Sequence, residues 1–233
     1  MSLVIPMHQE QEALTDLLPA IEVFRREQAL TLGFEVILVD DGSTDKSYDL
    51  SWKWADRSHF PVKVLRLKPR EGIGGALQAG FRFAAGRWIV TYDADMSYPL
   101  EDIPRLIAAG EAGADIVTAS PYRRDAGTEG VDRSRLGISR WATRLYRLRL
   151  GRRANDLSCF TCGFRAYRRS ALPQWTPRAK GFLATAEMLV RGLRSGLKVA
   201  EIPSRLRPRT KGRSKMKVFR TTLAHLRFLV FLR

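Results

Sequence analysis

Residues 88–99 read WIVTYDADMSYP, and the rest of the chain can be interpreted around this stretch. The apolar and β-branched run from Trp88 to Tyr92 predicts a buried strand that ends at Asp93-Ala94-Asp95. Strand alternation turns Asp93 and Asp95 the same way, and two neighbouring carboxylates repel each other unless a cation neutralises them. Carboxylate oxygens without His or Cys suit Mg²⁺ or Mn²⁺, so the stretch predicts a metal site. A surface turn before Pro99 is the alternative that these residues leave open.

Strand-like and helix-like segments alternate on both sides of this stretch. The predicted strands are Ser2–Pro6, Phe34–Val39, Val62–Leu67, Ala114–Ser120, Gly163–Arg168 and Lys198–Pro203. The predicted helices are Glu12–Gln28, a helix through Trp54, Ala76–Ala85, Leu100–Ala112, Arg133–Leu150 and Thr185–Ser195. The alternation predicts a single α/β domain: a Rossmann-like, doubly wound, mostly parallel sheet with helices on both faces. Ligands of such sheets bind outside the carboxyl ends of the strands.

A second acidic cluster, DDGSTD at residues 40–45, also follows a predicted strand, so both clusters are expected to face one crevice. Ser43 or Thr44 is the expected cap of the next helix. The glycine segment GIGGALQAG at residues 72–80 follows the third strand, whereas a dinucleotide-binding fingerprint follows the first. A tight turn is therefore the expected role of these glycines.

The charge of the chain is unbalanced, with 40 Lys and Arg against 24 Asp and Glu and a net charge of +16. The excess lies after residue 122, chiefly in residues 133–153 and 205–220. This pattern indicates a polyanionic partner, which is a nucleic acid, a phosphorylated ligand or an anionic membrane. Residues 121–132 are expected to form a mobile loop at the mouth of the site, and residues 205–217 a loop that wraps phosphates or a nucleic-acid tail.

Cys159 and Cys162 form a lone CxxC without a second pair or a nearby His, which argues against a zinc site. We expect two free thiols on a strand in a reducing cytoplasm. No apolar run is long enough for a signal peptide or for the roughly 20 residues of a membrane span. Residues 217–233 predict a basic amphipathic helix. It either lies in a membrane interface or docks on the core or on a partner subunit.

Six segments together resemble the dolichol-phosphate mannosyltransferase branch of the inverting family 2 glycosyltransferases. They are VIPMHQEQEAL (4–14), VILVDDGSTDKS (36–47), GIGGALQAG (72–80), YDADMSYPLEDIPRLI (92–107), GFRAYRRSAL (163–172) and EIPSRLRPRTKGRSKM (201–216). They occur in the family's order and span nearly the whole chain. The resemblance implies a GT-A fold over residues 1–216.

The resemblance also implies roles for particular residues. Pro6, His8, Glu10 and Asp41 would hold the base and ribose, with Val39 and Ala94 in the same nucleotide-sugar site, and Asp93 and Asp95 would hold Mg or Mn on the diphosphate. Two positions depart from the family. His8-Gln9-Glu10 replaces the usual Tyr-Asn-Glu, and Ser97 stands where many members carry Gln.

If the acceptor is a lipid monophosphate, the basic residues can bind the phosphates of both substrates. Arg123, Arg135 and Ser139 can bind the acceptor phosphate, while Arg209, Ser214 and Lys215 close over both phosphates, Ser214 on the acceptor side. Asp93, Asp95, Arg123 and Arg209 are the predicted catalytic residues of a single inverting displacement. The expected donor is GDP-mannose, with UDP-glucose second, and the expected acceptor is dolichyl or undecaprenyl phosphate.

These roles place the protein in the cytoplasm, peripheral on the inner face of a membrane, with a membrane-protein partner as one option. Two rival classes remain open from the residues alone. One is a nucleic-acid-binding protein, indicated by arginines interleaved with Trp141 and Tyr146. The paired acids argue against it, because they would repel a phosphate backbone. The other is nucleotidyl transfer to a sugar phosphate, which shares the metal and the fold type but releases pyrophosphate.

Overall fold

The computed structural model describes residues 1–28, 33–172, 177–209, 211 and 218–232, without the side chains of residues 133–135. The strands are β1 (Ser2–Met7), β2 (Glu35–Asp40), β3 (Val62–Arg66), β4 (Trp88–Thr91), β5 (Ile116–Ser120), β6 (Gly127–Thr128), β7 (Arg165–Arg168), β8 (Val199–Pro203) and β9 (Arg205–Leu206). The helices are α1 (Gln11–Glu27), α2 (Ser47–Arg57), α3 (Gly72–Phe83), α4 (Ile103–Glu111), α5 (Arg133–Leu150), α6 (Leu183–Arg194) and α7 (Val218–Val230). Short 3-10 turns lie at Leu100–Asp102, Gly151–Ala154 and Arg169–Ala171.

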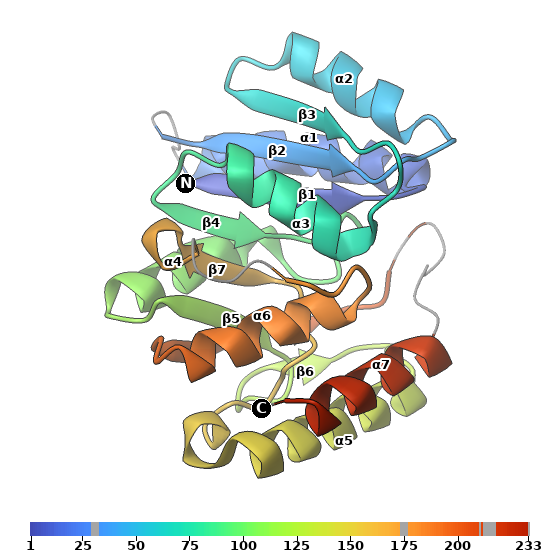
Figure 1. Cartoon of the computed structure of the whole chain (residues 1–233). Helices are drawn as coiled ribbons and strands as arrows, with labels where there is room; N and C mark the ends of the chain where they lie inside the picture. Colours follow the sequence, from blue (N-terminus) through green and yellow to red (C-terminus); the bar gives the residue numbers. More distant parts are fainter. Residues whose placement is uncertain (29–32, 173–176, 210, 212–217, 233) are drawn as a thin grey trace.

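The main sheet joins seven of these strands in the order β3-β2-β1-β4-β7-β5-β8. Strand β7 runs antiparallel to β4 and β5, and the other neighbouring pairs are parallel. Figure 1 shows α3 and α6 in front of the sheet and α1 and α4 behind it. The predicted α/β, mostly parallel sheet with helices on both faces is therefore confirmed. A separate parallel pair, β6 and β9, joins the loop after β5 to the chain after β8.

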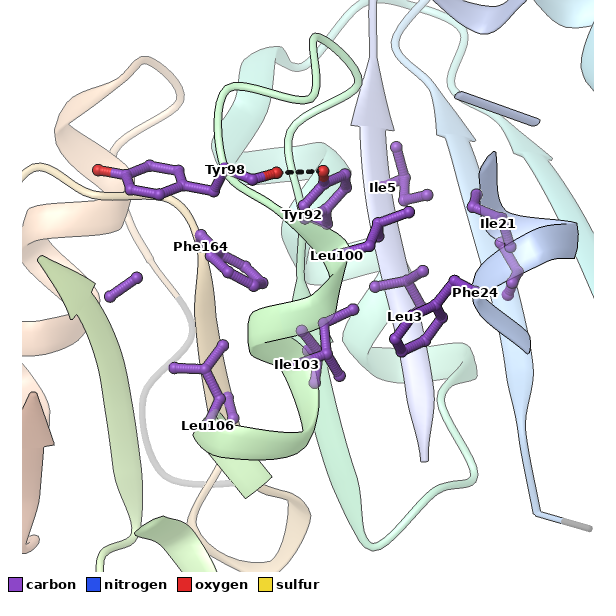
Figure 2. Close-up of a cluster of buried hydrophobic side chains, with 14 of the residues drawn as sticks. Leu3, Ile5, Ile21, Phe24, Tyr92, Tyr98, Leu100, Ile103, Leu106 and Phe164 are labelled. Carbon is purple, nitrogen blue, oxygen red and sulfur yellow. Dashed lines mark hydrogen bonds between the residues drawn. The ribbon is translucent and has the colours of Figure 1, made fainter. Parts of the chain in front are cut away.

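Side-chain alternation along β1 builds a hydrophobic core on each face of the sheet. Leu3 and Ile5 pack in the core that contains Ile21 of α1, whereas Val4 packs in the core that contains Leu77 of α3. Figure 2 shows the first of these cores, with Leu3 and Ile5 near Ile21. Both faces of the strand are covered, and this explains why the predicted strands are continuously apolar.

Gly72 adopts a φ of +77° where the chain enters α3, as expected of a turn that needs a glycine conformation, while Gly74 and Gly75 belong to the first turn of that helix. A Cβ on Gly72 or Gly74 would lie 2.1 or 1.9 Å from the carbonyl oxygen of Lys180 or Ala179. Close approach of residues 179–180 therefore requires glycine at these positions. The expected helix cap is wrong. Helix α2 starts after Lys46 and has no side-chain cap.

The CxxC segment is irregular and precedes β7, so its assignment to a strand is wrong. Cys159 and Cys162 are free and buried, as expected of unpaired thiols. Burial raises the pKa of both thiols, that of Cys162 to about 12, which makes them poor nucleophiles. The Glu201 carboxylate accepts hydrogen bonds from the backbone N–H of Ser158 and Cys159, at 2.8 and 2.9 Å, and so holds this segment.

The C-terminal segment forms helix α7, which packs against α5 and α6. It buries His225 and Leu229, while Phe219 and Phe231 are 84% and 75% exposed. Over the described residues, none of the helices combines the length and the apolar character needed to cross a bilayer. The division of the chain into residues 1–216 and 217–233 stays a prediction.

We expect acid to weaken the docking of α7 through His225. The hydroxyl of Tyr146 and Nδ1 of His225 are 2.7 Å apart, and burial lowers the pKa of His225 to about 4. Because this pKa lies below the unfolded value of about 6.5, the unfolded chain binds the extra proton first. The neutral, buried His225 therefore makes its full contribution to the free energy of unfolding above pH 6.5. As the pH falls toward 4 this contribution is lost, and the free energy of unfolding decreases by at most about 3 kcal/mol.

Urea unfolding at pH 7, 5.5 and 4.5 measures this effect against His225→Gln, which keeps a hydrogen-bond acceptor for Tyr146 but does not titrate. Wild-type stability should fall more steeply than that of the variant over this range. Parallel pH curves for the two proteins would contradict the assignment.

Candidate functional site

A cavity of about 720 Å³ opens at the carboxyl ends of β1, β2 and β4. Nine of the predicted site residues line it: Pro6, His8, Glu10, Asp41, Asp93, Ala94, Asp95, Ser139 and Arg209. Val39 is fully buried in the sheet instead, and Arg123 is exposed, with its guanidinium 3.4 Å from the carbonyl oxygen of Asp156. Ser214, Lys215 and the side chain of Arg135 lie outside the described residues.

Asp93 and Asp95 follow β4 on a loop that Tyr92 closes. The Tyr92 hydroxyl donates a hydrogen bond to the carbonyl of Tyr98, as Figure 2 shows. The Asp95 carboxylate accepts the backbone N–H and the hydroxyl of Ser97, at 3.1 and 2.6 Å. Ser97 therefore orients Asp95 from within its own loop.

Among the described residues, no group donates a hydrogen bond to the Asp93 carboxylate, and Gly163 packs against it. Burial, and after it the negative charge of Asp95, raises the pKa of Asp93 well above its ordinary value. The Arg209 cation opposes this rise, and the Glu10 carboxylate adds to it. The Asp93 carboxylate thus receives no hydrogen bond from a described residue and has more negative than positive charge around it. Such an environment favours a bound cation.

Arg209 bridges two carboxylates that are far apart in the sequence. Its Nε donates to Asp95 Oδ2 at 3.1 Å, and its Nη1 donates to both oxygens of Glu10, at 3.1 and 2.9 Å. Glu10 is 6% exposed, so this cation neutralises acidic groups that are largely shielded from water. The bridge ties the segment after β9 to the loops after β1 and β4.

Asp41 follows β2 and contacts the start of α3. Its Oδ1 accepts the backbone N–H groups of Glu71 and Gly72, at 2.7 and 3.0 Å, and its Oδ2 accepts Arg70 Nε at 3.1 Å. His8 lines the same part of the cavity, and its Nδ1 is buried without a hydrogen-bond partner in the described part of the chain. Burial, and after it the Arg70 charge, lowers the pKa of His8, so its imidazole is neutral at pH 7.

The donor set fits a hard divalent cation. Within the described ranges, no group of three or more His, Cys, Asp and Glu side chains is placed to hold a metal ion. Mg²⁺ commonly binds through one or two carboxylates and completes its coordination with water and substrate phosphates. Asp93 and Asp95 supply the two carboxylates, and the cavity beside them leaves room for a phosphorylated ligand.

The far part of the cavity runs between α5 and α7 and is largely apolar. Its lining includes Leu136, Ile138, Trp141 and Leu145 of α5, Val218, Leu226 and Leu229 of α7, and Phe182 before α6. The polar residues on these two helices that line it are Ser139, Thr221, Thr222 and His225. The Ser139 hydroxyl lies 2.9 Å from that of Thr161. The sequence analysis missed this region. Apolar spacing at the start of residues 133–150 was a usable signal, but the partner helix was not known.

Arg165 is a further residue that the sequence analysis did not single out, and it is fully buried. Its guanidinium donates to the Thr118 hydroxyl at 3.1 Å, to the Phe160 carbonyl at 2.8 Å and to the Thr185 carbonyl. These bonds join β5, the CxxC segment and α6 beneath the cavity. An arginine within an apolar strand pattern, as in Gly163–Arg168, was the available signal.

The mostly parallel sheet, with the paired carboxylates at the end of β4 and the adjoining cavity, is typical of the GT-A fold. The chain belongs to glycosyl transferase family 2, because the model of that family matches residues 2–175.

Two curated relatives support this assignment, and one solved structure shows the same fold. A dolichol-phosphate mannosyltransferase from Pyrococcus furiosus is 33% identical over 93% of this chain and 59% of its own length. An undecaprenyl-phosphate 4-deoxy-4-formamido-L-arabinose transferase from Pseudomonas fluorescens is 36% identical over 73% of this chain and 48% of its own length. The chain thus spans about half the length of these relatives. One similar solved structure is that of glucosyl-3-phosphoglycerate synthase from Mycobacterium tuberculosis in complex with Mn²⁺, UDP and glucosyl-3-phosphoglycerate. It is 19% identical in sequence, and the match covers 98% of this chain and 78% of that chain. The TM-score of 0.71 shows that the two proteins share a fold.

Proposed function

We propose that the protein transfers a hexose from a nucleoside diphosphate sugar to a polyprenyl phosphate, with inversion and with Mg²⁺ or Mn²⁺. The observation that carries the proposal is the cavity, which joins the carboxylates after β4 to apolar room between α5 and α7. The names of the two curated relatives support a polyprenyl-phosphate acceptor. GDP-mannose is the first choice of donor and UDP-glucose the second.

The acceptor phosphate is already ionised at neutral pH, so its oxygen can attack the anomeric carbon without a general base. The work of the chain is then to bind, orient and neutralise two anionic substrates. Asp41 and His8 bind the nucleoside, and Ser139 binds the acceptor phosphate. Arg123, which does not line the cavity, binds the same phosphate after it turns away from the Asp156 carbonyl. A metal ion held by Asp93 and Asp95 would stabilise the charge of the departing nucleoside diphosphate.

In this proposal Arg209 leaves its carboxylate partners to contact the donor diphosphate, since a guanidinium makes bidentate phosphate contacts. The displacement is a single in-line step, so no glycosyl-enzyme intermediate forms. Trapping such an intermediate would overturn this part of the proposal.

The test is transfer of radiolabelled sugar from a panel of GDP- and UDP-sugars to a short polyprenyl phosphate, with Mg²⁺, Mn²⁺ or EDTA. The proposal expects one metal-dependent lipid product, which also identifies the donor. Release of pyrophosphate instead of a nucleoside diphosphate would favour nucleotidyl transfer. No lipid product with any donor would contradict the proposed acceptor.

We also propose that α5 and α7 lie on the inner face of an anionic membrane, from which the acceptor enters. Neither helix contains Asp or Glu, and together they carry most of the large exposed apolar side chains. The set is Ile138, Trp141 and Leu148 from α5, and Val218, Phe219, Leu223, Val230 and Phe231 from or just after α7. Apolar side chains among cations are typical of interfacial helices.

Replacing Phe219 and Phe231 together by Ser is expected to weaken vesicle binding about tenfold, since two large exposed apolar groups are lost. The measurement is co-sedimentation with vesicles that contain anionic phospholipid. These substitutions spare His225 and Leu229, which pack on the core. The matched control is Trp52→Ser on α2, where the side chain is 57% exposed on a different helix. Unchanged sedimentation of the double variant would refute the membrane placement.

A further inference from the structure

Residues 177–182, just before α6, form a segment that crosses the start of α3. The Pro177 carbonyl accepts a hydrogen bond from Gln78 Nε2 at 2.9 Å, and the Lys180 carbonyl accepts one from the N–H of Gly74 at 3.1 Å. The backbone N–H groups of Arg178 and Ala179 both donate to Glu187 Oε2, at 2.9 and 2.8 Å. The segment is therefore tied to α3 on one side and to α6 on the other.

The contact with α3 is tight because of its glycines. The carbonyl oxygens of Ala179 and Lys180 occupy the space that Cβ atoms on Gly74 and Gly72 would need. The N–H of Gly72 also donates to Asp41. The 177–182 segment and the Asp41 carboxylate are thus positioned by the same helical turn, so a shift of one displaces the other.

Lys180 brings a cation to this wall of the cavity. Its side chain is exposed and lines the cavity together with Asp41 and Arg70. Arg70 is engaged by Asp41 at 3.1 Å, whereas Lys180 makes no side-chain hydrogen bond or ion pair with a described residue. A lysine ammonium is a compact charge that suits a phosphate group.

Glu187 is placed to hold the segment and not to react. Its side chain is 3% exposed, its Oε2 accepts two backbone N–H groups, and its Oε1 pairs with Arg191 at 2.7 Å. Both oxygens are occupied, and the residue does not line the cavity. It can therefore influence a ligand only through the segment that it fixes.

We propose that Lys180 contacts the diphosphate of the nucleotide sugar and that Glu187 is the positioning residue that holds Lys180 there. This inference rests on the proposed function, because it requires a nucleoside diphosphate sugar in the cavity. Neither residue reacts, so both act on donor binding and leave the chemical step nearly unchanged.

The experiment measures Kd for GDP-mannose and UDP-glucose with Mn²⁺ by calorimetry, and KM and kcat for the donor that reacts. Lys180→Ala should raise Kd and KM about tenfold and change kcat less than threefold, since one exposed phosphate contact is lost. Glu187→Ala should weaken binding at least as much. Glu187→Gln keeps an oxygen acceptor for both N–H groups and should restore most of the affinity.

A double variant separates positioning from general damage. If Glu187 acts through Lys180, Lys180→Ala combined with Glu187→Ala should bind no more weakly than Glu187→Ala alone. The matched control is Lys53→Ala, which removes an exposed lysine from α2 and should bind as the wild type does. Thermal unfolding checks that each variant folds. Lys180 is exposed, so its variant tests the proposal even where Glu187→Ala fails to fold.

The outcomes distinguish this inference from the proposed function. If the wild type binds a nucleotide sugar and Lys180→Ala binds it equally well, the inference is overturned and the proposed function is not. Fully additive losses in the double variant overturn the positioning role of Glu187. Absence of binding of either nucleotide sugar by the wild type overturns the proposed function and this inference with it.

Discussion

Replacing Asp93 or Asp95 by Asn is expected to lower kcat/KM for sugar transfer by about a thousandfold. Each substitution removes one negative charge and leaves an amide, which is a weaker ligand for Mg²⁺ or Mn²⁺. Asp93→Asn should cost at least as much as Asp95→Asn, because no described residue donates a hydrogen bond to the Asp93 carboxylate, whereas Ser97 and Arg209 engage Asp95.

The measurement is initial rate against donor concentration at several Mn²⁺ concentrations. Asp49→Asn on α2 is the matched control, because it makes the same chemical change at an exposed position away from the cavity. Asp93→Asn should keep wild-type stability or exceed it, since burial and the neighbouring Asp95 charge both raise the pKa of Asp93 and so disfavour its ionised form. Activity of either variant within tenfold of the wild type would contradict the metal site.

The acidic clusters after β2 and β4 could be predicted to face one crevice because parallel strands deliver their carboxyl ends to one edge. The involvement of Pro6, His8 and Glu10 after β1 came only from the family resemblance. The strand pattern was also readable, since both faces of β1 are covered and its apolar run is unbroken. Helix α5 has the predicted bounds of Arg133–Leu150, because its periodicity is long and ends at a glycine.

Other features could not be read because they depend on contacts between distant segments. The GIGG glycines predicted a turn, but not the close approach of the carbonyl groups of residues 179–180 to Gly72 and Gly74. The bridge from Arg209 to Glu10 joins residues 199 positions apart. The basic character of residues 205–217 indicated anionic partners, but not that two of them are carboxylates of the chain itself.

If the proposed function holds, the bridge makes Arg209 a competitor of the metal as well as a ligand of the substrate. Its Nε lies 3.1 Å from Asp95 Oδ2, an oxygen that the metal is expected to use. A guanidinium at this distance neutralises part of the carboxylate charge and repels a metal ion bound to the same oxygen, so it weakens metal binding there. Removing the guanidinium should therefore affect metal binding and sugar transfer in opposite directions.

Arg209→Ala is expected to lower kcat/KM for transfer about a hundredfold, because a bidentate donor to the diphosphate is lost. Arg209→Lys should recover part of this loss, since it keeps the charge without the planar fork. Without nucleotide, the Ala variant should bind Mn²⁺ more tightly than the wild type, because Asp95 and Glu10 are no longer neutralised. Electron paramagnetic resonance of free Mn²⁺ measures this affinity.

Arg205→Ala is the matched control, because that arginine is 60% exposed and lies 3.9 Å from Glu129. It should leave both the Mn²⁺ affinity and the rate of transfer unchanged. Weaker Mn²⁺ binding in Arg209→Ala would mean that Arg209 supports the metal site and does not compete for it. Transfer by Arg209→Ala at the wild-type rate would remove Arg209 from the donor site, and the bridge to Glu10 would then serve only to hold the segment after β9 against the sheet.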